Sequence, residues 1–99
     1  MVQEIRFEWD ARKAAENLRK HGVAFPEAET VFEDESALLL PDPDHSRDEE
    51  RFVLLGASAA RRLLVVVHCE RPRGNVIRLI SARMADRDER AQYVERGSQ

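Results

Sequence analysis

The chain has 99 residues and a mass of 11.4 kDa, which suits one domain and leaves no room for a second hydrophobic core. Its longest aliphatic run, Leu63 to Val67, is far shorter than the roughly 20 residues that span a membrane. The N-terminus lacks the apolar core of a signal peptide, and a single cysteine, Cys69, excludes an internal disulfide and a cysteine-based zinc site. We therefore expect one cytoplasmic domain over residues 1–99, with no membrane contact and with its last few residues frayed.

The net charge of -3 is distributed unevenly along the chain. Residues 27–50 carry ten acidic side chains and one basic, whereas residues 51–99 carry ten basic and five acidic. Fourteen of the sixteen basic residues are arginines, whose planar guanidinium suits phosphate and carboxylate groups alike. The composition leaves two interpretations open. One is a surface for phosphate or for an acidic partner, and the other is a set of surface salt bridges that stabilise little.

The first third of the sequence predicts a strand followed by two helices. Residues 5–9 alternate between apolar and charged side chains, the period of a strand with one buried face. Asp10 is a suitable N-cap for a helix that ends at Gly22. Its apolar residues recur at helical spacing: Ala11, Ala14, Ala15 and Leu18. Pro26 fits the first turn of a second, short helix. The apolar stripe of that helix consists of Phe25, Ala28, Val31 and Phe32.

The rest of the sequence predicts four strands and a last helix. A short strand over 36–40 precedes a proline-rich loop at 41–44, and three strands follow at about 51–58, 63–70 and 76–83. Their short connections favour antiparallel pairing. Asp86 and Glu89 have the spacing of a capping box for a helix that reaches about residue 95. The expected fold is α+β, an antiparallel sheet in the order β-α-α-β-β-β-β-α with the helices packed mainly on one face.

His68 and Glu70 are candidates for acid–base chemistry. Alternation places both side chains on the face of the most apolar strand that also carries Leu64 and Val66. A histidine and a carboxylate two positions apart can act as an acid–base pair. The alternative is a strand end at which polar residues emerge from the core. A metal site built from the three scattered histidines is a weaker alternative, and we expect no metal or other cofactor.

Arg78 and Arg83 are candidates for phosphate binding on the last strand. Strict alternation places them on opposite faces, and a bulge that would bring Arg83 to the face of Arg78 is not evident in the sequence. An arginine on an open face can meet a phosphate, whereas one under a helix needs a buried carboxylate. Ionisable residues of two strands on one face would resemble a small nuclease. Metal-free RNA cleavage needs a base for the 2′-hydroxyl, an acid for the leaving oxygen and cations at the phosphorane.

Many short motifs in order along the chain, from Phe7 to Tyr93, resemble one family. They are Phe7-Glu8-Trp9-Asp10 with Lys13 and Asn17; Lys20-His21-Gly22-Val23 with Phe25 and Glu27-Ala28; Val31-Phe32 with Asp34; Asp42-Pro43; His45-Ser46; Asp48-Glu49-Glu50-Arg51-Phe52; Gly56 with Ser58; Arg62-Leu63-Leu64-Val65-Val66-Val67-His68 with Glu70-Arg71; Ile77-Arg78; Ser81-Ala82-Arg83; and Glu89-Arg90 with Tyr93. Together they resemble the BrnT-type toxins of bacterial type II toxin–antitoxin systems, small ribonucleases with a RelE-like fold. The chain departs from that pattern at Arg61, where a turn glycine is usual, and at Glu35, Met84 and Asp86, where proline, lysine and threonine are common.

The resemblance implies a single BrnT-like toxin domain that cleaves RNA as a metal-independent endoribonuclease and inhibits translation. It implies neutralisation by a BrnA-like antitoxin with a ribbon-helix-helix part, through which the complex binds operator DNA. We expect a dimer or a heterotetramer with two copies of each chain. His68, Glu70, Arg78 and Arg83 are the expected catalytic residues. A second group of expected substrate-binding residues consists of Lys13, Lys20, His21, His45, Glu49 and Arg51.

Two other functions stay open at this point. The chain is alternatively an inactive toxin that acts only as a co-repressor with its antitoxin on operator DNA, an interpretation that the departures at Arg61, Met84 and Asp86 favour weakly. It is alternatively an RNA-binding domain without catalytic activity. Growth arrest on expression without the antitoxin would distinguish the first alternative from an active toxin.

Overall fold

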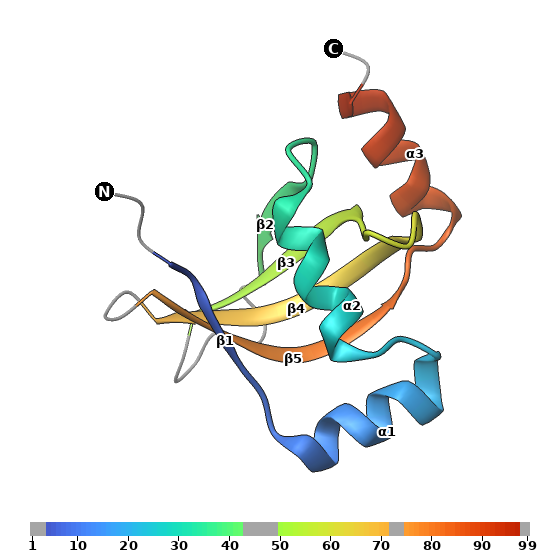
Figure 1. Ribbon diagram of the computed structural model, residues 1–99. Helices are drawn as coiled ribbons and strands as arrows, with labels where there is room; N and C mark the ends of the chain where they lie inside the picture. Colours follow the sequence, from blue (N-terminus) through green and yellow to red (C-terminus); the bar gives the residue numbers. More distant parts are fainter. Residues whose placement is uncertain (1–3, 43–49, 72–74, 98–99) are drawn as a thin grey trace.

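The computed structural model describes residues 4–42, 50–71 and 75–97, which form a five-stranded sheet and three helices (Figure 1). In chain order the elements are β1 (Arg6–Glu8), α1 (Ala11–His21), α2 (Phe25–Thr30), the single 3-10 turn η1 (Val31–Glu33), β2 (Leu38–Pro41), β3 (Arg51–Ala57), β4 (Leu63–Arg71), β5 (Val76–Met84) and α3 (Arg87–Gly97). The α+β class is confirmed. In the described part of the chain, no helix is both long and apolar enough to cross a membrane.

The sheet has the strand order β1-β5-β4-β3-β2 and is mixed. From β2 to β5 each strand pairs antiparallel with the next, as expected from the short connections. The expectation of a fully antiparallel sheet is wrong for β1, which pairs parallel with β5 and sets Glu8 beside Arg78. Parallel pairing needs a long connection. Two helices and three strands separate β1 from β5 in the chain and supply it.

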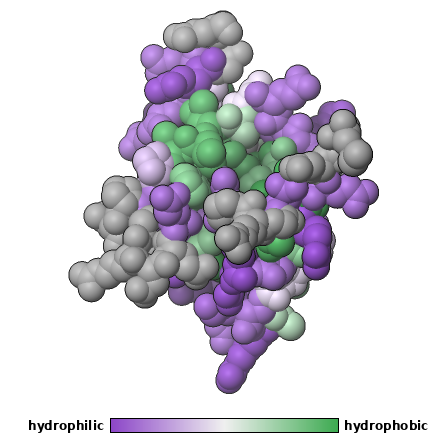
Figure 2. Space-filling view, turned by 90° about the vertical axis from the view of Figure 1, so that its left-hand side faces the viewer, coloured by the Kyte–Doolittle hydropathy of each residue, from purple (hydrophilic) through white to green (hydrophobic). Residues whose placement is uncertain are grey.

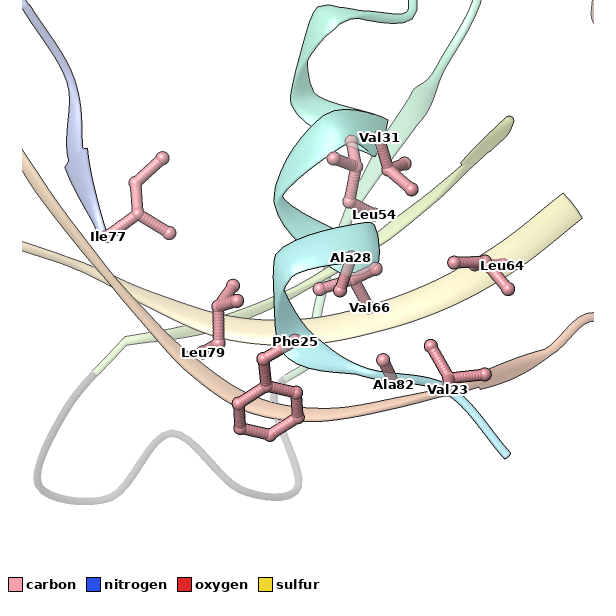
Figure 3. Close-up of a cluster of buried hydrophobic side chains, with 10 residues drawn as sticks. All are labelled: Val23, Phe25, Ala28, Val31, Leu54, Leu64, Val66, Ile77, Leu79 and Ala82. Atoms are coloured by element: carbon pink, nitrogen blue, oxygen red, sulfur yellow. The ribbon is translucent and has the colours of Figure 1, made fainter. Parts of the chain in front are cut away.

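The main hydrophobic core lies between the sheet and the first two helices (Figures 1 and 3). From α2 and η1, Phe25, Ala28 and Val31 point toward the sheet, and all three are buried, which confirms the predicted stripe. They meet side chains of the three central strands: Leu54, Leu64, Val66, Ile77, Leu79 and Ala82. We call this side of the sheet the inner face and the opposite side the outer face.

The third helix packs against a smaller core of outer-face residues. This cluster contains Leu55, Leu63, Val65 and Ala85, with Leu38, Val53 and Tyr93 packed against it. The expectation that the helices lie mainly on one face therefore holds for α1 and α2, whereas α3 contacts the other side through Tyr93. The capping box is present, because Asp86 N–H donates to Glu89 Oε1 and Glu89 N–H donates to Asp86 Oδ1, each at 2.8 Å.

Helix α1 begins and ends as predicted but turns an unexpected residue inward. Asp10 accepts hydrogen bonds from the backbone N–H groups of Arg12 and Lys13, and Gly22 ends the helix with a φ of 70°. Leu18, predicted to lie on the buried stripe, is 51% exposed, whereas Asn17 is only 6% exposed. The reason is a set of hydrogen bonds between Asn17 and the backbone of β5.

Candidate functional site

The face that each residue of β5 occupies depends on an irregularity in that strand. Val67 of β4 lies opposite Ser81, but the next residue, His68, lies opposite Leu79, so that Ile80 is an extra residue in β5. Residues opposite each other in a ladder share a face. Because Arg83 lies opposite Val65 and Arg78 opposite Cys69, both arginines are on the outer face. The expectation that Arg78 and Arg83 lie on opposite faces is wrong, and the bulge is the cause.

His68 and Glu70 lie together on the inner face. Nε2 of His68 is 3.0 Å from Oε2 of Glu70, which confirms that the two side chains share a face. The His68 ring is fully buried between Phe52, stacked at 5.9 Å, and Phe32, edge-on at 4.8 Å. Its Nδ1 has no hydrogen-bond partner among the described residues. The Glu70 side chain is exposed. In this arrangement Glu70 can contact a substrate, whereas His68 acts on it only by holding the carboxylate.

Glu70 lines a hollow of about 440 Å³ at the end of β4. Its lining consists of Ile5, Phe32, Glu50, Phe52, Glu70, Arg71, Asn75, Val76 and Ile77. Arg71 also lines an adjoining hollow of about 360 Å³, together with Glu8, Trp9, Asp10 and Arg78. Arg71 lies 3.4 Å from Glu8, with which it forms an ion pair. Glu70 of the inner face and Arg78 of the outer face therefore line separate hollows at one end of the sheet, and Arg71 lines both.

Asp10, the N-cap of α1, lines the same hollow as Arg78. The pKa of the Asp10 carboxyl is lowered by hydrogen bonds from the N–H groups of Lys13 and Arg12, and in smaller part by the positive charges of Lys13 and Arg78. Arg51, at the start of β3, extends the basic row on the outer face, because it lies opposite Cys69, which in turn lies opposite Arg78. At about 4.8 Å per strand, Arg51 and Arg78 are about 10 Å apart at their Cα atoms.

Arg83 is separated from this group along β5. Five residues at about 3.3 Å each place it about 16 Å from Arg78. Its guanidinium donates two hydrogen bonds of 2.8 Å to Glu89 of α3 and one of 3.2 Å to the carbonyl of Met84. The Arg83 guanidinium holds the pKa of the Glu89 carboxyl below its usual range. In the structure Arg83 therefore joins β5 to α3 and does not line the hollow of Glu70.

The other expected substrate-binding residues are dispersed. Lys13, Lys20 and His21 are exposed on α1, where Lys20 lines a separate surface hollow with Glu16 and Arg19. His45 and Glu49 lie outside the described residues. Among those described, no three His, Cys, Asp or Glu side chains are grouped as ligands of a metal ion.

Arg71 is a residue that sequence reasoning did not single out as a candidate. It is the last residue of β4 and follows Glu70, so alternation assigns it to the other face of the sheet. Arg71 nevertheless lines the hollows on both sides of the strand end. Its position at the end of β4 could have indicated this role, because the last residue of a strand can contact either face of the sheet.

The contact between Asp34 and Tyr93 is a second feature that the sequence did not reveal. The Tyr93 hydroxyl donates to Asp34 Oδ2 at 2.7 Å, and the N–H groups of Ala57 and Ser36 donate to the same carboxylate. Burial raises the pKa of the Asp34 carboxyl. The three hydrogen bonds together lower it by more than burial raises it, so the net shift is downward. The contact fixes α3 to the turn before β2.

Comparison with known proteins gives a family for the chain. The family model described as the ribonuclease toxin BrnT of type II toxin–antitoxin systems matches residues 9–89. The crystal structure of the ribonuclease toxin BrnT of Brucella abortus is similar in fold, with a TM-score of 0.66 and 23% sequence identity, and the match covers 85% of this chain and 100% of that one. No curated protein matches the chain. Because the family model covers most of the sequence, including β3, β4 and β5 with Glu70, Arg71 and Arg78, the chain belongs to the BrnT family of ribonuclease toxins of type II toxin–antitoxin systems.

Proposed function

We propose that the chain is a metal-independent endoribonuclease that cleaves RNA at the end of β4 and thereby inhibits translation. The observation that carries this proposal is that Glu70 and Arg71 line one hollow at the end of β4, and that Arg71 lines an adjoining hollow together with Arg78. A carboxylate and a neighbouring arginine supply a base and a cation for phosphodiester cleavage by the 2′-hydroxyl, and Arg78 adds a cation in the adjoining hollow.

In the proposed reaction Glu70 accepts the proton of the 2′-hydroxyl. The 2′-oxygen then forms a bond to phosphorus, the bond to the 5′-oxygen breaks, and the leaving oxygen takes a proton from water. The products are a 2′,3′-cyclic phosphate and a 5′-hydroxyl. Arg71 stabilises the negative charge of the phosphorane, and Arg78, in the adjoining hollow, binds a neighbouring phosphate of the RNA. His68 is a positioning residue, because it is buried and holds the Glu70 carboxylate through Nε2 at 3.0 Å.

Other basic side chains bind the RNA away from the reacting phosphate in this proposal. Arg51 lies on the same outer face as Arg78, two strands away. Arg83 binds a phosphate farther along the outer face, in competition with its ion pair to Glu89. Lys13, Lys20 and His21 of α1, together with His45 and Glu49, form the proposed outer part of the substrate site.

The proposed partner is a BrnA-like antitoxin with a ribbon-helix-helix part, in keeping with a family of type II toxin–antitoxin systems. We further infer that two copies of each chain form a heterotetramer in the cytoplasm and that the antitoxin contacts operator DNA. Measuring the mass of the co-expressed complex tests this stoichiometry, and a heterodimer with one copy of each chain would contradict it.

Cleavage of a purified long RNA in the presence of EDTA tests the reaction. The wild type is expected to give discrete fragments that end in 2′,3′-cyclic phosphates. Glu70→Gln removes the base and is expected to lower the rate by about 100-fold or more, as is Arg78→Ala, which removes a cation. Glu95→Gln, an exposed carboxylate of α3, is the matched control and should cleave normally. His68→Gln should lower the rate and change its pH profile, because it alters how the carboxylate is held.

Two outcomes would overturn the proposal. A folded Glu70→Gln variant with full activity would exclude Glu70 as the base. Intact RNA from the folded wild type, together with tighter operator binding by the antitoxin when the chain is present, would instead indicate a co-repressor.

A further inference from the structure

Strand β2 forms one edge of the sheet and exposes large apolar side chains. It pairs with β3 alone in the described part of the chain. Leu39 and Leu40 are 51% and 41% exposed. Figure 2 views the molecule from the left-hand side of Figure 1. Hydrophobic side chains gather in the upper half of this view, at the height at which Figure 1 places β2. Leu39 lies opposite Leu54 of the inner face and Leu40 opposite Val53 of the outer face, so exposed apolar side chains lie on both sides of this edge. Exposed apolar surface of this kind marks an interaction site.

The backbone of β2 offers hydrogen-bonding groups along the edge that points away from β3. The N–H of Asp42 donates to the carbonyl of Arg51 at 2.9 Å, so the even-numbered residues of β2 direct their backbone groups toward β3. Because these directions alternate along an antiparallel strand, the N–H and C=O of Leu39 and the C=O of Pro41 point away from the sheet. Such an edge is a template for an added strand.

Two acidic side chains in the segment just before β2 have no partner among the described residues. Among the described residues Glu33 and Glu35, which precede β2, are exposed and make no ion pair or hydrogen bond through their carboxylates. Carboxylates that stabilise this fold are paired, as Glu27 is with Arg62 and Glu89 with Arg83. The unpaired carboxylates near β2 therefore contribute little to folding and are available to cations of another molecule.

These charges decide which occupant fits the edge. A second copy of this chain would add its β2 to the first and bring the acidic residues before and after the two strands against each other, which is destabilising. RNA is repelled by the same charges. An extended protein segment with apolar side chains beside Leu39 and Leu40, one on each face, and Lys or Arg at its ends satisfies the backbone groups, the leucines and the carboxylates together.

We propose that β2 is the docking site for such a basic, apolar strand of the antitoxin, which pairs with the edge at Leu39. This inference rests on the proposed toxin function for the identity of the partner. It separates two surfaces on one small domain. The antitoxin strand binds the acidic edge at β2, and RNA binds the arginines at the outer face and at the end of β4.

Matched substitutions test the site with the purified chain and its cognate antitoxin. Leu39→Glu should weaken antitoxin binding by about tenfold or more, since one exposed leucine and the charge balance of the edge are both lost. Leu18→Glu is the control, because Leu18 is also 51% exposed but lies on α1. The double variant Glu33→Lys with Glu35→Lys should weaken binding similarly, whereas Glu16→Lys with Glu95→Lys should not. None of these residues belongs to the proposed cleavage site.

Amide hydrogen exchange distinguishes strand pairing from apolar contact alone. Antitoxin binding should slow exchange at the Leu39 amide by about tenfold or more, because its N–H gains a partner. An unchanged Leu39 amide in the bound complex would overturn the proposal, as would an unchanged affinity of the Leu39→Glu variant. A chain that dimerises alone and becomes monomeric in Leu39→Glu would assign the edge to a second copy and would also overturn it.

RNA cleavage by the same variants separates this inference from the proposed function. Variants that cleave RNA normally and fail to bind the antitoxin support the docking site. Variants that cleave RNA and bind the antitoxin normally overturn the docking site and leave the ribonuclease proposal intact. If the wild type does not cleave RNA, the ribonuclease proposal fails, and the affinity and exchange data still decide the docking site.

Discussion

Asn17 holds α1 against β5, and its replacement is a quantitative test of how the sheet edge is stabilised. Its carboxamide donates to the carbonyls of Val23 and Ala82 at 2.9 and 2.8 Å and accepts from the N–H of Ala82 at 3.0 Å. β1 covers β5 only from Val76 to Arg78. Farther along β5, the side chain of Asn17 therefore takes the place of a neighbouring strand at Ala82.

Asn17→Leu keeps a similar side-chain volume but removes all three hydrogen bonds. Two carbonyls and one N–H are then left without partners at a site where Asn17 is only 6% exposed. At about 1 kcal/mol for each lost hydrogen bond, the free energy of unfolding should fall by about 3 kcal/mol. For a domain of this size, that loss should lower Tm by roughly 12 to 24 °C.

Urea denaturation followed by tryptophan fluorescence measures this change. Trp9 is the single tryptophan and packs edge-to-face on Phe25 at 5.8 Å, so its emission reports the contact between the chain before α1 and the core. Glu16→Leu, an exposed neighbour on the same helix, is the control and should change stability little. A loss below about 1 kcal/mol in Asn17→Leu would refute the argument that the carboxamide replaces a strand.

Three further predictions concern stability. Arg61 has a φ of 63° in the turn between β3 and β4, so Arg61→Gly should raise the free energy of unfolding by about 1 kcal/mol, and an unchanged value in urea would contradict this. Because Arg83 lowers the pKa of Glu89, this pair stabilises the fold above the ordinary value of 4.5, and its contribution is lost as the pH falls through the lowered pKa. Stability should therefore decline less on acidification in Glu89→Gln than in the wild type, and equal slopes would contradict the assignment. Gly56→Ala would set a Cβ 2.9 Å from Ala37 Cβ, with an expected loss of about 1 to 3 kcal/mol, and unchanged stability would show that the neighbours yield.

The features of the fold that depend on neighbouring residues were predictable from the sequence. The cap at Asp10, the stop at Gly22 and the capping box of Asp86 and Glu89 all form as predicted. Each of these motifs satisfies backbone groups of its own helix, so no knowledge of the rest of the fold is needed. The shared face of His68 and Glu70 was predictable for the same reason, since both lie on one strand.

The features that depend on distant residues were not predictable in this way. The helical spacing in α1 favours a buried Leu18, but the free backbone groups of Ala82 are 65 residues away from Asn17 and turn that residue inward. Likewise, the parallel pairing of β1 with β5 follows from which strand edge stays open after the other strands have paired. The partner of Arg83 depends on where α3 lies.

The bulge in β5 has a physical cause in the positions of the apolar residues along that strand. Ile77, Leu79 and Ala82 all belong to the inner core, and a regular strand cannot place both Leu79 and Ala82 on one face, because they are three residues apart. One extra residue, Ile80, resolves the conflict. Without it, Leu79 would leave the core and Arg78 would take its place under the helices, where an unpaired charge costs several kcal/mol. The requirements of the core therefore bring Arg78 to the outer face and make it available to a phosphate.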